Sequence, residues 1–119
     1  MHPSRKNNLG KFAEDFAVNF LQQKGYKIIE RNFRSRFGEI DIVACEGSTL
    51  VFVEVKARWS KRFGSPEEAV TPNKLWKIKK TGEYFTSLHP ELPERQRIDV
   101  VAVEIEGSRV LAARIIKVD

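Results

Sequence analysis

Apolar residues follow two different spacings along the chain. Between residues 8 and 25 they recur every three or four positions, which predicts a helix with one apolar face. Gly25 follows as a plausible helix stop. Three later stretches carry the β-branched and aromatic side chains typical of strands. We predict these strands at residues 26–33, 38–45 and 49–56.

The second half of the chain predicts one more helix and two more strands. Ser65 before Pro66, with Glu68 three residues after Ser65, forms a capping-box pattern, and Thr71-Pro72 repeats the start signal. We expect a helix from there to about Leu88, then strands at 96–105 and 109–118 joined by a hairpin turn. The order α-β-β-β-α-β-β favours an α/β fold in one domain of 119 residues, with helices packed on a mixed sheet.

Composition narrows the class of protein. Apolar residues make up 41% and charged residues 31% of the chain, which is typical of a soluble globular protein. No apolar run exceeds four residues, so we expect no membrane span, and the polar, basic start predicts no export and a cytoplasmic protein. One cysteine and two distant histidines exclude a Cys/His zinc site. The net charge of +5 favours a polyanionic partner, chiefly nucleic acid, although many basic proteins only have solvated basic faces.

Two carboxylates interrupt otherwise apolar strands. Asp41 lies within one predicted strand and Glu54 within another, although burying a charge in a strand is costly. Glu54 and Lys56 are two residues apart and therefore project from the same face. If the two strands form a hairpin, Asp41 and Glu54 fall roughly opposite each other. Two carboxylates and an ammonium group would then converge on one patch.

Such a patch has the parts of a metal-dependent phosphodiesterase. Magnesium binds few protein carboxylates, keeps several waters and binds phosphate oxygens beside them. It can polarise a phosphodiester and lower the pKa of a bound water, and a lysine can stabilise the developing charge. The alternative is a structural role, in which Lys56 neutralises Glu54 and Asp41 caps a turn.

Four other carboxylates need an interpretation. Glu14 lies at the flank of the apolar face of the first helix, where it can reach the sheet edge, although a solvated carboxylate is the alternative; Asp15 points to solvent. Glu39 shares a face with Asp41 and is either an outer carboxylate of the site or a charge at the strand entry. Asp99 opens a strand, and we interpret it as structural, paired with a basic residue.

Basic residues flank the predicted acidic patch on both sides. Trp76 and Tyr84 share the outward side of the second helix with two lysines, an arrangement that can grip phosphates and stack on unpaired bases, or form a solvated face. No base-reading motif is present in the sequence, so we expect binding without sequence specificity, to DNA or RNA. The predicted nucleic-acid-binding residues are Arg31, Arg34, Arg36, Arg58, Trp59, Lys61, Arg62, Lys74, Lys77 and Lys80.

A series of short motifs runs along the whole chain: Gly10 with Glu14 and Ala17, Gly25-Tyr26, Arg31-Asn32, Gly38-Glu39-Ile40-Asp41, Val51-Phe52-Val53-Glu54-Val55-Lys56, Gly64-Ser65-Pro66, Ala69-Val70, Lys74, and Ile98-Asp99-Val100-Val101. With these motifs the chain resembles the YraN family of small bacterial proteins, which is related to archaeal Holliday junction resolvases of the PD-(D/E)xK nuclease superfamily. Asp41, Glu54 and Lys56 match the D-x12-E-x-K core, with Ile40 in place of the nominal proline.

The resemblance implies a restriction-endonuclease-like fold and an endonuclease that hydrolyses DNA, including branched or junction DNA, in repair or recombination. It implies Mg²⁺, with Mn²⁺ as a substitute, bound by Asp41, Glu54 and the Val55 carbonyl. Lys56 matches the catalytic lysine, and Glu14 matches a helix-one glutamate used near the metal. Related resolvases are homodimers, so the resemblance allows a homodimer here. The alternative is a non-catalytic nucleic-acid-binding module of the same fold.

Overall fold

The predicted order of helices and strands is confirmed. The computed structural model describes residues 3–58 and 70–119, and in the first helix it describes side chains from Gly10 onward. The first helix begins at Pro3, earlier than the apolar periodicity indicated, and the strands lie close to their predicted ranges. The elements are α1 (Pro3–Gln23), β1 (Lys27–Ser35), β2 (Gly38–Glu46), β3 (Thr49–Arg58), α2 (Pro72–Leu88), β4 (Gln96–Glu106) and β5 (Arg109–Lys117).

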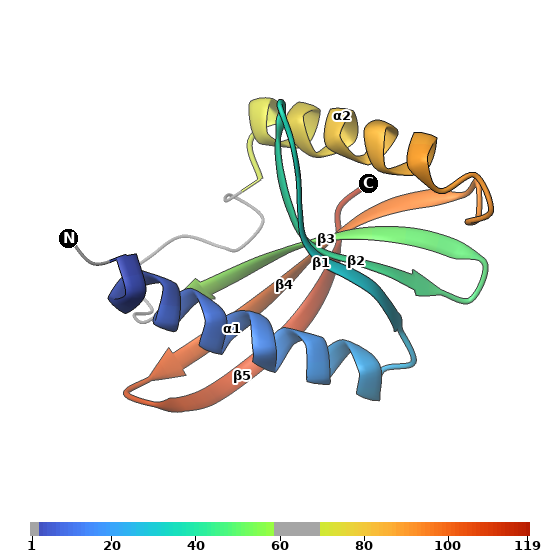
Figure 1. The fold of residues 1–119 in the computed structure, drawn as a ribbon. Coiled ribbons are helices and arrows are strands. Elements are labelled where there is room, and N and C mark those ends of the chain that lie inside the picture. The colour runs from blue at the N-terminus through green and yellow to red at the C-terminus, as the bar shows by residue number, and fades with distance from the viewer. Residues whose placement is uncertain (1–2, 59–69) are drawn as a thin grey trace.

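The strands form one mixed sheet of five, in the order β1-β2-β3-β4-β5. Neighbouring strands are antiparallel except β3 and β4, which run parallel, with α2 in the connection between them. The helices α1 and α2 cover opposite faces of the sheet (Figure 1). Neither described helix is long and apolar enough to cross a membrane.

Each face of the sheet carries its own apolar core. On the α1 side, Ala17 and Leu21 pack over strand residues that include Val53. On the α2 side, Phe85 packs over residues that include Phe52. Adjacent residues of β3 thus point into different cores, as is typical of a central strand covered on both faces.

The sheet divides at Asp41. The β2–β3 pairs end at Ile42 and Val53, whereas the β1–β2 pairs continue to Ser35 and Gly38. Asn32 of β1 lies opposite Asp41, between the paired residues on either side. Its φ of 56° is left-handed, a conformation that asparagine tolerates better than most residues. Beyond this point the β1–β2 hairpin leaves β3 and rises to α2 (Figure 1). We call this division of the sheet the fork.

Aromatic packing holds the raised hairpin against α2. The ring of Phe33 lies edge-on to that of Phe85, with centroids 4.9 Å apart. Phe37, near the hairpin tip, lies edge-on to Trp76 at 5.7 Å. The hydroxyls of Ser35 and Thr81 are 2.8 Å apart, within hydrogen-bond distance. The hairpin therefore bridges the sheet and the second helix.

Asp99 belongs to a buried polar network on the other side of the sheet from α2. Its carboxylate is fully buried and accepts hydrogen bonds from Arg97 Nε at 2.8 Å and the Tyr26 hydroxyl at 2.8 Å. Arg97 also donates to Glu46 at 2.6 Å. Burial and the negative charge of Asp99 raise the pKa of Tyr26 well above its ordinary value. The predicted pairing of Asp99 with a basic residue is confirmed.

Candidate active site

The fork fixes the position of the Asp41 carboxylate. Because β2 no longer pairs with β3 here, the Val55 amide has no β2 carbonyl opposite it in the regular register. The Val55 N–H instead donates to Asp41 Oδ2 at 2.8 Å. The side chain thus takes the place of a backbone acceptor and satisfies a donor that would otherwise be unpaired.

Several negative charges act on Asp41. Burial, the charge of Glu54 and the weaker effects of Glu14 and Glu39 together raise its pKa to about 7, against the opposing effect of the Val55 N–H. These four carboxylates come from β2, β3 and α1. The fork therefore gathers carboxylates that lie far apart in the sequence, and near-neutral titration of an aspartate is typical of a functional site.

Glu54 is neutralised by a lysine from the second helix. Its side chain is only 9% exposed, and its Oε2 lies 2.5 Å from Lys74 Nζ. Thr71 caps α2 by accepting a hydrogen bond from the Lys74 amide at 3.1 Å, which fixes the turn that carries the lysine. The structural alternative considered above assigned this ion pair to Lys56, and the structure assigns it to Lys74.

Lys56 follows Glu54 by two residues in β3 and is exposed. Within residues 10–58 and 70–119 it makes no ion pair. The alternation of β3 places it on the Glu54 side of the strand, as predicted. Its ammonium group is therefore available to a ligand that approaches this face.

Glu14 lies at the flank of the apolar face of α1, close to the edge of the sheet, as predicted. Its side chain is largely buried and accepts a hydrogen bond from Arg31 Nη2 at 3.4 Å. The same guanidinium donates to Asp15 at 2.7 Å, so Asp15 faces Arg31 as well as solvent. The hydrogen bond from Arg31 and a second one from Lys11 lower the pKa of Asp15, with the bond from Arg31 as the larger cause. Arg31 thereby ties α1 to β1 beside the fork.

The side chains at the fork are few but suited to magnesium. Within the described residues, no three histidine, cysteine, aspartate or glutamate side chains lie in an arrangement that could hold a metal ion. Mg²⁺ characteristically uses one or two carboxylates and keeps several waters. Asp41, Glu54 and the Val55 carbonyl would offer such an ion only oxygen ligands. The raised pKa of Asp41 also shows an excess of negative charge that a divalent cation would relieve.

The basic residues predicted to bind nucleic acid have several different surroundings. Arg34 lies 3.5 Å from Glu39, and Arg36 lies over the ring of Phe37. Lys80 lies over the ring of Trp76, while Lys77 contributes its side chain beside Gly38. Arg58 ends β3 and is half-buried. Three predicted residues lie outside the described part of the chain: Trp59, Lys61 and Arg62. The predicted capping box of Ser65, Pro66 and Glu68 also lies outside it.

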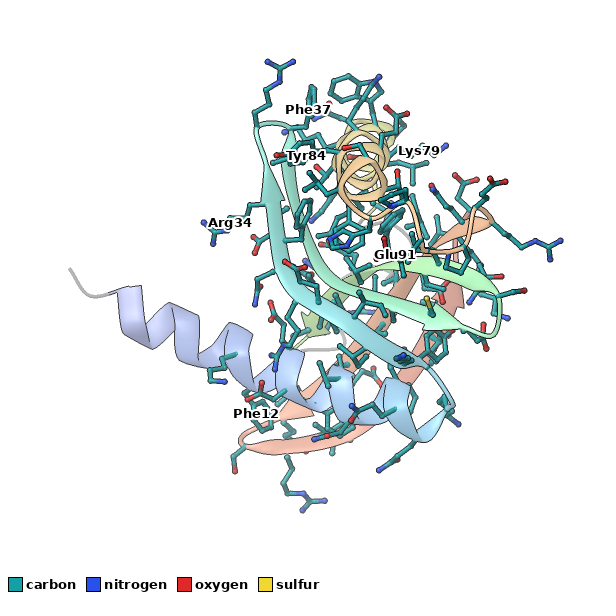
Figure 2. All side chains as sticks on the ribbon, turned by 45° about the vertical axis from the view of Figure 1, so that its right-hand side comes forward. Phe12, Arg34, Phe37, Lys79, Tyr84 and Glu91 are labelled. Carbon is teal, nitrogen blue, oxygen red and sulfur yellow. The ribbon has the colours of Figure 1, made fainter. Side chains whose placement is uncertain are left out.

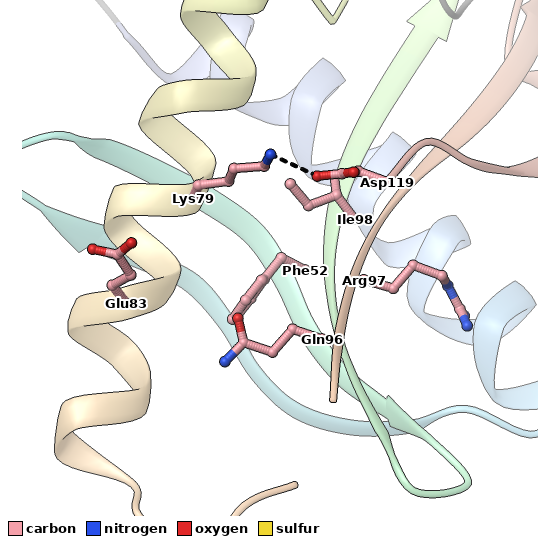
Figure 3. A pocket seen from close by; sticks show the side chains of 7 residues that line it. All are labelled: Phe52, Lys79, Glu83, Gln96, Arg97, Ile98 and Asp119. Atoms are coloured by element: carbon pink, nitrogen blue, oxygen red, sulfur yellow. Dashed lines mark ion pairs between the residues drawn. The ribbon is translucent and has the colours of Figure 1, made fainter. Parts of the chain in front are cut away.

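A hollow on the other side of α2 is separate from the fork. It has a volume of about 280 Å³ and lies between α2 and the start of β4 (Figure 3). An ion pair between Lys79 and Asp119, 2.8 Å apart, spans it. None of its lining residues belongs to the carboxylate site. We therefore assign it no part in the chemistry at the fork.

Sequence reasoning missed two features of the site. It named Lys74 only as a phosphate contact and did not place it on Glu54, although its position three residues after Thr71 fixes it in the first turn of α2. It also did not place Phe37 against Trp76. The signal was weak, because a side chain at a hairpin turn has no periodicity that points to a partner.

Proteins of similar sequence cover nearly the whole chain. A family model described as "Uncharacterised protein family UPF0102" matches residues 13–103, which include both carboxylates of the fork. A UPF0102 protein of Syntrophomonas wolfei is 46% identical over 101 residues, covering 85% of this chain and 88% of its own length. One from Caldicellulosiruptor saccharolyticus is 45% identical over 113 residues (94% and 96%), and one from Caldicellulosiruptor bescii is 49% identical over 100 residues (83% and 84%).

Proposed function

The chain belongs to the UPF0102 family, also known as the YraN family, and from the carboxylates at its fork we propose that it is a Mg²⁺-dependent endonuclease. The proposed reaction is hydrolysis of phosphodiester bonds in DNA, including branched or junction DNA, in repair or recombination. The observation that carries the proposal is the setting of Asp41, which accepts the Val55 N–H at the fork and makes no ion pair within the described residues, while burial and neighbouring carboxylates raise its pKa.

A purely structural ion pair accounts for the negative charge of Glu54 at the fork but not for that of Asp41. Glu54 has the Lys74 ammonium beside it. Within the described residues no lysine, arginine or histidine forms an ion pair with Asp41, which accepts only an uncharged N–H. A half-buried carboxylate that has no cationic partner among the described residues and lies near three other carboxylates is costly to keep ionised. Such a cost is expected where a site binds a cation.

Each residue of the site has a distinct proposed role. Bound Mg²⁺ would supply Lewis-acid activation of the phosphodiester and of a water molecule. Asp41, oriented by the Val55 N–H, and Glu54, held by Lys74, would provide the carboxylate ligands. Glu14, from α1, would tune or share the metal. Lys56 would place its ammonium group beside the phosphate oxygens and stabilise the charge that develops there.

Cleavage assays test this proposal directly. Purified protein is incubated with labelled four-way junctions and linear duplexes, with Mg²⁺, with Mn²⁺ or with chelator. We expect metal-dependent products from the wild type, and a loss of at least about 100-fold in Asp41→Asn, Glu54→Gln and Lys56→Met, as is typical when general acid–base or electrostatic groups are removed. Glu106→Gln, at the exposed β4–β5 turn, is the matched carboxylate control and should cleave normally.

Equal cleavage by the wild type and all three site variants would contradict the proposal. Folding is monitored by circular dichroism, because Asp41 and Glu54 are packed at the fork. Lys56→Met provides the decisive comparison, because an exposed side chain can be replaced with little effect on stability. If Lys56→Met loses cleavage while its unfolding is unchanged, Lys56 acts in the reaction itself.

The second candidate function is a nucleic-acid-binding module without chemistry. The Lys74–Glu54 ion pair favours it, because an ammonium group already occupies one side of Glu54 where a metal would bind. This candidate predicts nucleic-acid binding that weakens steeply with salt and no metal-dependent product. It also predicts that Lys74→Met leaves binding of Mn²⁺ undetectable, whereas a true metal site should bind Mn²⁺ more tightly when the competing ammonium is removed.

A further inference from the structure

The hairpin tip and α2 together form a basic and aromatic surface beyond the fork. Arg34, Arg36 and Phe37 come from the β1–β2 hairpin, and Trp76, Lys80 and Tyr84 come from α2. We call these six residues the basic-aromatic surface. Phe37 and Tyr84 lie on the side of α2 that faces the hairpin, while Lys79 lies on the other side of the helix (Figure 2).

The aromatic rings of this surface are packed in position yet still accessible. Trp76 is 49% exposed and Tyr84 is 48% exposed, although both are large apolar side chains. Trp76 is held edge-on by Phe37, and Tyr84 lies 5.9 Å from Phe33. Because these contacts use only part of each ring, the remaining area can accept a flat partner.

A hollow adjoins these rings. It has a volume of about 480 Å³ and is lined by Arg34, Ser35, Arg36, Phe37 and Tyr84. This size falls within the range of about 300–1,000 Å³ typical of ligand sites. The lining joins two guanidinium groups to two aromatic rings, which matches a ligand that carries both phosphates and flat bases.

The charges on the surface favour an anionic ligand. Arg36 lies over Phe37 at 5.0 Å, and Lys80 lies over Trp76 at 5.8 Å. Glu39 and Glu83 approach Arg34 and Lys80 at 3.5 and 3.7 Å, but exposed pairs of this kind exchange partners readily. A protein-binding surface is usually depleted of charge at its centre, and this one is not.

We propose that the basic-aromatic surface binds an unpaired, single-stranded stretch of nucleic acid. Bases stack on Trp76 and Tyr84, and Arg34, Arg36 and Lys80 hold the phosphates. Aromatic stacking suits any unpaired base, because every base has a flat face, and it is denied to a closed duplex. The inference rests on the proposed function, because it names the substrate class of the same nuclease. That class is nucleic acid in which a single strand joins a duplex, with the junction bound near the fork of the protein sheet.

Binding of a fluorescein-labelled oligothymidylate, measured by anisotropy in chelator to prevent cleavage, tests the inference. We expect the single strand to bind more tightly than a duplex of equal length. Trp76→Ala and Tyr84→Ala should each weaken binding by about 5- to 100-fold, whereas Trp76→Phe should retain most of it. Phe12→Ala removes an exposed aromatic from α1, on the opposite face, and should bind like the wild type. The same measurement with a labelled oligouridylate shows whether the surface binds DNA or RNA more tightly.

Charge and fluorescence provide two further readouts. Lys80→Ala should reduce the slope of log affinity against log salt, while Lys79→Ala, on the same helix but across from the surface, should leave it unchanged. In a Trp59→Phe variant, Trp76 is the sole tryptophan, and its emission should fall as the oligothymidylate saturates. Unchanged emission, together with wild-type affinity in Trp76→Ala and Tyr84→Ala, would overturn the inference.

The same measurements separate this inference from the nuclease proposal. Asp41→Asn should abolish cleavage while binding the oligothymidylate as tightly as the wild type. If the wild type binds the single strand through Trp76 but cleaves nothing, the nuclease proposal is contradicted and the single-strand inference is supported. If cleavage depends on Asp41 but single-strand affinity is unaffected by the aromatic variants, the single-strand inference is contradicted and the nuclease proposal is supported.

Discussion

Asp41 is held where its negative charge is disfavoured, and this has a consequence for stability. Its pKa is about 7 in the folded protein, against an ordinary value of 3.8. The folded protein therefore binds this proton more tightly than the unfolded chain does. The resulting stabilisation is fully present below about pH 4 and is lost as the pH rises through 7.

We predict that Asp41→Asn removes this loss. The amide oxygen can still accept the Val55 N–H but carries no charge to bury. In chelator, the variant should be more stable than the wild type by about 2–4 kcal/mol near pH 8 and equal to it near pH 4. Urea unfolding across this range measures the difference. Glu83→Gln, which removes an exposed carboxylate of α2, is the control, and parallel curves for wild type and Asp41→Asn would contradict the prediction.

Contact between α2 and β3 depends on one residue that has no side chain. A Cβ added to Gly82 would lie 2.6 Å from Phe52 Cε2, too close for either group to remain in place. Phe52 is buried between β3 and α2, so the ring has little room to move. The packing of α2, and with it the position of Lys74, therefore depends on glycine at this position.

Gly82→Ala should destabilise the protein, although alanine is the better helix former. The gain in helix propensity is about 1 kcal/mol, and overpacking in a core costs about 1–3 kcal/mol, with the larger values expected for a rigid aromatic neighbour. Gly10→Ala is the matched control, because a Cβ there meets nothing within 4 Å and should stabilise α1. Thermal unfolding of both variants compares the two effects, and a higher Tm for Gly82→Ala would contradict the packing argument.

The elements themselves were largely predictable, and the fork was not. Spacing and turn residues predicted both helices, the strands and the final hairpin, because each is a local pattern. The fork depends on the left-handed Asn32 and on where β2 leaves β3, which no local pattern specifies. The Lys74–Glu54 pair and the Phe37–Trp76 contact likewise join segments far apart in the chain. Asp41 and Glu54 were predictable because a charge within an apolar strand is conspicuous wherever the strand lies.

The candidate site belongs to the whole molecule rather than to any one element. Asp41 comes from β2, Glu54 from β3, Glu14 from α1, and the neutralising Lys74 from α2. These residues meet only when the sheet and both helices are in place. A cation that binds there would therefore recognise the folded state alone, and its binding free energy would add to folding stability.

Under the nuclease proposal, Mn²⁺ or Mg²⁺ should raise the Tm, and the rise should depend on pH. At a concentration 100 times the dissociation constant, the added stability is about 2.7 kcal/mol. Near pH 8 Asp41 is ionised and can bind the cation, whereas near pH 5 a proton competes for the same carboxylate, because its pKa is about 7. The thermal shift should thus be large at pH 8, small at pH 5 and absent in Asp41→Asn and Glu54→Gln, while Glu106→Gln keeps it. A shift of equal size at both pH values, or one that persists in both site variants, would show that the cation binds elsewhere and would leave the fork without its proposed metal.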